Sequence, residues 1–227
     1  MSVEYYENGK KIVEHYYKNN IDHVSYYFND KLHREDGPAV ISYHDDGSIE
    51  REIYYFDGEY HRNDGPAITK YFENETKLIE QFWYKGKKHR IDGPAEIWYH
   101  ENGIINSEEY FINDRLHRID NPARIKYFSN GNVHHIEEYY YNGNIHREYG
   151  PAKIIYYQDG NIEKEEYFKN GKKHRKDGPA LLLYDNNGLL YSKKYHFNGI
   201  EFDPENLPFD LPVNDSEKEL YFNLKYR

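Results

Sequence analysis

The chain has 227 residues, of which 37% are hydrophobic and 18% aromatic, and its 40 acidic and 30 basic residues give a net charge of -10. This charge repels phosphate backbones and anionic lipid surfaces, so we expect no nucleic-acid partner. There is no cysteine, which excludes disulfides and thiolate metal sites. No apolar run approaches the ~18 residues of a membrane span, and charges stand where a signal peptide needs an apolar region. We therefore expect a cytoplasmic protein without membrane insertion.

One motif, His-Arg-x-Asp-Gly-Pro-Ala, recurs along the chain. It begins at each of six histidines, spaced by 28 or 29 residues: His33, His61, His89, His117, His146 and His174. Self-similarity at a fixed period is the signature of a repeat architecture. The sequence predicts an all-β, elongated repeat array of antiparallel β-hairpins, with about 28 residues per repeat.

Three regions are predicted from the start of the chain to its end. Residues 1–30 form a degenerate N-terminal capping repeat, because a hairpin of the regular unit is missing there. Residues 31–200 hold six repeats. Residues 201–227 are a Pro-rich C-terminal cap, in which a capping box beginning at Ser216 predicts a short helix over 217–225.

Each repeat is expected to contain two strands and two turns. The first strand starts at the motif alanine and places Ala, a β-branched or aliphatic residue and Tyr on one face, as in Ala39, Ile41 and Tyr43. A tight Asn/Asp-Gly turn follows. The second strand runs to another such turn and carries a glutamate column, from Glu52 to Glu165, and aromatic side chains on both faces.

The motif itself is interpreted as a corner. Its Asp is expected to bond the backbone just ahead, its Gly to take a positive φ, and its Pro to stiffen the entry to the next strand. Asn121 replaces the glycine once, and Asn tolerates positive φ next best. Tyr149 replaces the aspartate once, so that bond is helpful rather than essential.

The motif histidines and the motif arginines each form a column along the array. The histidine column suggests metal binding. Equivalent residues two strands apart are separated by about 10 Å, which is too far for histidines of successive repeats to share one ion. No metal site is predicted. Because stacked like charges need partners, the arginines are expected to stack on the aromatic stripe that runs from Tyr55 to Phe168, or to pair with the glutamate column.

No catalytic residue is predicted. Acidic and histidine side chains stand mainly at repeated positions, which the repeat explains. The departures from the repeat, Asn121, Tyr149, His134–His135 and Thr69, include no nucleophile with an evident base. No phosphate loop or dinucleotide fingerprint is present, so no cofactor is expected.

An aromatic stripe on the second strand is the best candidate for binding. It is either covered by loops and arginines, or open as a partner surface or dimer interface. The candidate binding residues are Tyr55, Trp83, Phe111, Tyr140 and Phe168, with Trp98 on the neighbouring strand. We expect a non-enzymatic scaffold for protein-protein interaction, with a homo-oligomer left open. The alternative is carbohydrate or lipid-headgroup binding through the aromatic ribbon.

Two segments, residues 54–68 and 167–188, resemble the MORN-like repeat variants of bacterial antitoxin-like proteins and large DNA viruses. The resemblance extends over residues 3–200, although the His-Arg-x-Asp-Gly-Pro corner displaces the usual Gly-x-Gly spacing. The family's aromatic and Gly positions fall on Tyr54 with Gly58, Tyr139 with Gly143, and Tyr167 with Gly171.

The resemblance implies a sheet of successive hairpins used for protein interaction or scaffolding, sometimes with lipid binding, and no catalytic residues. Abundant Lys, Asn, Ile and Tyr are compatible with an A/T-rich viral genome, which would place the protein in the host cytoplasm or the virion.

Overall fold

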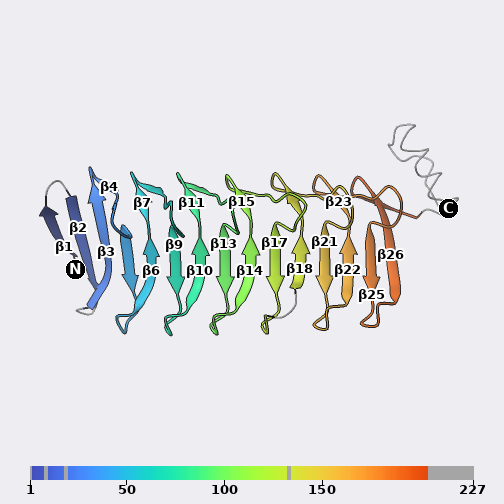
Figure 1. The fold of residues 1–227 in the computed structure, drawn as a ribbon, viewed down its shortest axis with the longest axis horizontal. Helices are drawn as coiled ribbons and strands as arrows, with labels where there is room; N and C mark the ends of the chain where they lie inside the picture. The colour runs from blue at the N-terminus through green and yellow to red at the C-terminus, as the bar shows by residue number, and fades with distance from the viewer. Residues whose placement is uncertain (1, 8–9, 18–19, 132–133, 204–227) are drawn as a thin grey trace. The chain divides into compact units, whose positions relative to one another are not determined.

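A computed structural model describes residues 2–7, 10–17, 20–131 and 134–203 (Figure 1). Within these ranges every regular element is a β-strand and none is a helix, and the strands form successive antiparallel hairpins. The prediction of an all-β repeat array is therefore confirmed. The helix expected over 217–225 and residues 204–227 of the C-terminal cap lie outside the described residues. The chain divides into two compact units, residues 1–115 with 129–131 and residues 116–128 with 132–227.

The long strands of the first unit form an antiparallel sheet in the order β1-β2-β3-β5-β6-β9-β10-β13-β14. Their bounds are β1 Ser2–Glu7, β2 Lys10–Tyr17, β3 Asn20–Phe28, β5 Val40–Tyr43, β6 Ile49–Ile53, β9 Ile68–Tyr71, β10 Lys77–Gln81, β13 Glu96–Tyr99 and β14 Ile105–Glu109. Between them lie the short strands β4 Lys31–Leu32, β7 Tyr55–Phe56, β8 Glu59–Tyr60, β11 Trp83–Tyr84, β12 Lys87–Lys88, β15 Phe111–Ile112 and β16 Arg115–Leu116, whose last residue belongs to the second unit.

The second unit repeats the same plan, with long strands in the order β17-β18-β21-β22-β25-β26 and β27 paired to the end of β26. The long strands are β17 Arg124–Tyr127, β18 His134–Glu138, β21 Lys153–Tyr156, β22 Ile162–Glu166, β25 Leu181–Tyr184, β26 Leu190–Phe197 and β27 Ile200–Phe202. The short strands are β19 Tyr140–Tyr141, β20 Asn144–Ile145, β23 Phe168–Lys169 and β24 Lys172–Lys173.

The sequence predicts one continuous second strand per repeat, and this is wrong in detail. In the second repeat the strand is broken at Phe82 into β10 and β11, and β11 pairs with β12 in a small separate hairpin. The break occurs because the Phe82 amide donates to the carbonyl of Ala95, while the next two residues turn away to their own partner strand. In each unit of Figure 1 the small hairpins line one end of the long strands.

The predicted Asn/Asp-Gly turns are confirmed. In the β7–β8 turn Asp57 has φ 50° and Gly58 has φ 83°, and Asn142 and Gly143 repeat this pair at 50° and 84°. Lys85 takes the same place with φ 49°, a conformation that costs a lysine more than an asparagine.

The core consists of small and branched side chains. The motif alanines have no exposed surface, and the isoleucines that pair across strands, such as Ile53, Ile68 and Ile79, are buried. None of the large side chains in the described ranges is fully buried. Stability in each unit therefore comes from many neighbour contacts between repeats, as is typical of such arrays. The alanines with 0% exposure are Ala39, Ala67, Ala95, Ala123, Ala152 and Ala180.

Candidate functional site

The motif arginine clamps the corner that carries it. The Arg90 guanidinium stacks on Phe82, with Cζ 3.9 Å from the ring centroid. Its Nε donates to Asp92 Oδ1 at 2.8 Å, and Nη1 donates to the carbonyl of Pro94 at 3.3 Å. Stacking on the equivalent ring and the bond to the proline carbonyl recur at Arg34, Arg62, Arg147 and Arg175.

Two expectations about these columns are wrong. The arginines stack on the first aromatic column, such as Tyr54 and Phe82, rather than on the stripe that begins at Tyr55. They pair with the motif aspartate rather than the glutamate column, because the two side chains leave the same tight turn two residues apart. The hydrogen bond and charge of Arg90 hold the pKa of Asp92 below its ordinary value.

The motif glycine is also explained differently from the expectation. Gly93 does not have a positive φ, and neither do its equivalents at 37, 65 and 178. Instead, a Cβ at Gly93 would lie 2.9 Å from Cζ of Arg90, so the missing side chain makes room for the guanidinium. In the fourth repeat it is Asp120, with φ 60°, rather than Asn121 that takes the left-handed conformation, and Gly150 in the fifth repeat does have φ 98°.

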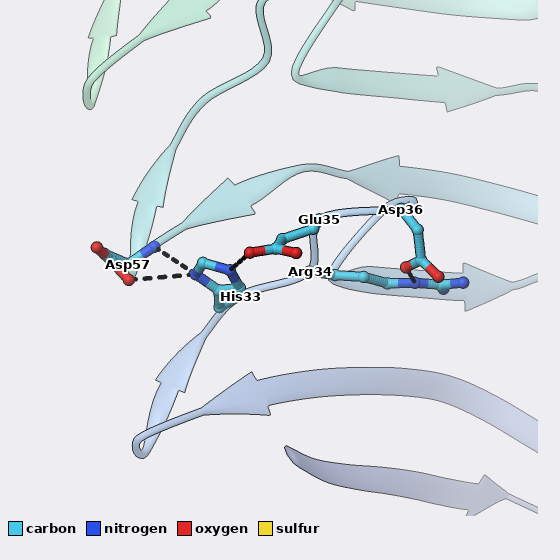
Figure 2. A network of polar contacts seen from close by, with 5 residues as sticks. All are labelled: His33, Arg34, Glu35, Asp36 and Asp57. Carbon is cyan, nitrogen blue, oxygen red and sulfur yellow. Dashed lines mark hydrogen bonds and ion pairs between the residues drawn. The ribbon is translucent and has the colours of Figure 1, made fainter. Parts of the chain in front are cut away.

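The motif histidine joins successive repeats. His33 Nδ1 accepts the backbone N–H of Asp57 at 3.1 Å and lies 3.2 Å from its Oδ1, while Nε2 lies 3.9 Å from Glu35 (Figure 2). The same bond to the next small hairpin is made by five other histidines, as donor–acceptor pairs Lys85–His61, Asn113–His89, Asn142–His117, Asn170–His146 and Asn198–His174. Each imidazole is thus occupied by an amide of the neighbouring repeat.

The glutamate column has phenol partners. Tyr99 donates to Glu80 Oε2 at 2.5 Å, and Tyr184 donates to Glu165 Oε2 at 2.9 Å. Burial and this hydrogen bond raise the pKa of Tyr184 to about 12.

Glu96 and Glu138 are buried carboxylates on the strands, and each is paired with a cation. Glu96 is 6% exposed and accepts from Lys88, from Trp98 Nε1 at 2.7 Å and from Gln81 at 2.8 Å. Burial alone would raise the pKa of Glu96, but these hydrogen bonds and the Lys88 charge outweigh it and lower the pKa. Glu138, held by Arg124 and Lys153, shows the same net lowering.

The predicted binding residues stay a prediction, and the structure brings part of them together. In the first unit Tyr55, Tyr60 and Trp83 form a run of rings, with centroid separations of 4.7 and 5.1 Å. Lys88 follows over both Trp83 and Phe111, at 5.6 and 4.7 Å. These rings are half-buried. We call this run, with Phe111, the ring row.

The remaining predicted residues are Trp98 in the first unit and Tyr140 and Phe168 in the second. Trp98, on β13, is 38% exposed. In the second unit Tyr140 is half-buried with Arg124 at 5.7 Å from its ring, and Phe168 is half-buried on β23.

Sequence reasoning missed one exposed aromatic column. Its rings alternate with the motif histidines, so that Phe56 lies 4.7 Å from His33 and 6.0 Å from His61. The column comprises Phe28, Phe56, Tyr84 and Tyr141, which are 39%, 48%, 47% and 53% exposed. The signal was present, since these residues stand two positions before the end of each small-hairpin turn.

No group of three or more His, Asp or Glu side chains within the described ranges is placed to hold a metal ion. The repeated acids and bases hold one another or the backbone. No helix in the part of the chain that the structure describes is long and apolar enough to cross a membrane. In comparisons with known proteins, the chain matches no family and no curated protein significantly.

Proposed function

We propose that this protein is a non-enzymatic, MORN-like repeat scaffold that binds a protein partner through the ring row, in the cytoplasm of a host cell or in the virion of a large DNA virus. The array of antiparallel hairpins is compatible with such repeats. The A/T-rich codon usage implied by the composition supports the viral source.

The observation that carries the proposal is the continuous run of Tyr55, Tyr60 and Trp83. Three large rings in mutual contact remain half-exposed, whereas the Arg, His and Glu columns are engaged within the array. Partly exposed aromatic residues are the side chains most enriched at interface hot spots.

Ring orientation favours a protein over a sugar. Tyr55 and Tyr60 are tilted by 34°, and Tyr60 and Trp83 by 48°, so neighbouring rings cover part of each other's faces. Rings tilted against one another can pack against the side chains of a protein partner, but they do not form the single flat platform on which a sugar would stack.

The test is capture of partners by the full chain and by the Trp83→Ala, Trp98→Ala double variant, with mass spectrometry as the readout. The control is Tyr149→Ala, which removes a ring that is 86% exposed but stands in a corner of the second unit. We expect the double variant to lose a partner that the parent and the control retain. If all three capture the same proteins, the ring row is not the binding surface; if the parent captures none, light scattering decides whether the row joins copies of this chain.

A further inference from the structure

The histidine joints form a column of identical hydrogen bonds. In all six, imidazole Nδ1 accepts a backbone N–H from a residue 24 or 25 positions further on, at 3.1 to 3.3 Å. The donor residue has φ of 49° or 50° each time, which turns its N–H toward the ring. Each joint therefore fixes one small hairpin to the next.

The donor determines the protonation state of the ring. An amide N–H can only donate, so Nδ1 must present its lone pair and the proton of the neutral ring must be on Nε2. Carboxylates near Nε2 agree with this, since Glu35 lies 3.9 Å from His33 and Glu148 lies 3.6 Å from His146. A second proton on Nδ1 would set two donors against each other and remove the bond.

The first joint differs from the others in a single group. Asp57 supplies both the amide at 3.1 Å and a carboxylate oxygen at 3.2 Å from His33 Nδ1. In the neutral ring, Nδ1 accepts the Asp57 amide N–H; in the protonated ring, Nδ1–H donates to the Asp57 carboxylate. Nδ1 therefore has a partner in either state. Asn113, at the same place opposite His89, offers no such charge.

We propose that the histidine column is a proton-sensitive latch, and that the residue donating its amide decides which joints open in acid. Histidine changes charge between about pH 8 and pH 5. When the rings gain a second proton, the His89–Asn113 joint opens, whereas the His33–Asp57 joint persists as an ion pair. This inference concerns the array itself and goes beyond the proposed binding function.

Other charged groups around the two rings lie on the corners and strands that line the hollows beside them. The hollow beside His89 is lined by two corner pairs that neutralise each other, Arg62 with Asp64 and Arg90 with Asp92, while Asp114 accepts the backbone N–H of Lys88. Beside His33 the charged groups are Asp57 and those lining its hollow, Lys10, Lys11, Arg34, Glu35 and Asp36, of which Arg34 and Asp36 pair with each other.

Hydrogen exchange of the full chain tests the latch, read as protection factors at about pH 7.5 and about pH 5. The readout is the amide that follows each donor residue, because it bonds the same neighbouring hairpin without using the imidazole: Asp114 donates to the carbonyl of Lys88, and Gly58 donates to the carbonyl of Leu32. We expect the protection of the Asp114 amide to fall about tenfold in acid, which is the equivalent of one lost hydrogen bond, and that of the Gly58 amide to stay within a factor of about two. Ring nitrogen shifts of His89 at the higher pH should show the Nε2–H form.

Two isosteric exchanges provide the matched control, because Asp and Asn both occupy this position naturally in the array. Asp57→Asn should make the first joint acid-sensitive, and Asn113→Asp should make the third resistant. In His89→Gln, which cannot titrate, Asp114 protection should no longer depend on pH. The latch is overturned if Asp114 protection does not fall in acid, if the Asp114 and Gly58 amides fall equally, if the exchanges do not transfer the sensitivity, or if His89→Gln leaves it in place.

Discussion

Replacing Gly93 with alanine tests the explanation of the corner glycine most directly. The new Cβ would lie 2.9 Å from Cζ of Arg90 and 3.2 Å from Nη2. An arginine tip is flexible, so the guanidinium rather than the backbone should move. It would then lose its stacking on Phe82 and its hydrogen bond to Pro94.

The size of the effect follows from those two contacts. A cation over an aromatic ring contributes about 1 kcal/mol at a partly exposed site, and a hydrogen bond to a carbonyl about 1 kcal/mol. Gly93→Ala should therefore lower the free energy of unfolding by about 2 kcal/mol. Arg90→Ala should cost about the same, because it removes the same contacts.

The assay is a double-mutant cycle measured by urea unfolding. The Gly93→Ala, Arg90→Ala double variant should lose about 2 kcal/mol rather than the sum of about 4, because the alanine no longer meets a guanidinium. Gly103→Ala is the control, since Gly103 has φ +81° and nothing within 4 Å of a Cβ, so its backbone cost should add to that of Arg90→Ala. Additive losses at Gly93 would refute the explanation.

Three further predictions concern charge and strain. Lys88→Ala should lower the free energy of unfolding by about 3 kcal/mol, because Glu96 stays buried without its cation. Thermal unfolding should show that adding Glu96→Gln restores part of this stability. Because the folded pKa of Glu96 is lowered, its stabilisation is present above the ordinary pKa of 4.5 and is lost as pH falls through the folded pKa. Lys85→Asn should stabilise by about 1 kcal/mol, since asparagine tolerates φ 49° better, and an unchanged urea midpoint would contradict this. The phenol of Tyr184, whose folded pKa is raised to about 12 from 10.0, contributes stability below pH 10.0 that is lost as pH rises toward 12, and Glu165→Gln should lower the pH at which phenolate absorbance appears.

Local patterns were enough to predict the strands and turns. Alternation from Ala39 to Tyr43 indicated a strand, and the Asp57-Gly58 pair indicated a positive-φ turn. The inward face was predicted less well, because the buried residue of β5 is Ser42 rather than Ile41 or Tyr43. Both the strand and the turn depend on residues that are neighbours in sequence. They can be read without knowing what the next repeat contributes.

Contacts between repeats could not be predicted in the same way. The His33–Asp57 joint spans 24 positions and uses a backbone amide, which leaves no mark on residue identity. The glycine at 93 was assigned a positive φ because turns commonly need one, whereas the actual reason is a guanidinium that returns over it. The break at Phe82 was missed because Phe82 and Trp83 follow β10 without a turn residue between them, although β11 pairs with β12 rather than with the partner strands of β10.

A substitution at Trp98 tests partner binding with less effect on folding than a substitution at one of the repeated rings. Its position on β13 is held elsewhere in the array by dissimilar residues, lysine among them at Lys70 and Lys126, so the repeat does not require a ring there. Trp83, by contrast, packs against Tyr60 and Lys88, and its removal loosens a small hairpin as well as a surface. Trp98→Lys should therefore leave the urea midpoint nearly unchanged, because the lysine ammonium can replace the indole N–H as a donor to Glu96, and it should weaken partner capture. If capture survives this change but is lost with Trp83→Ala, the repeated rings form the interface and the indole at 98 is incidental.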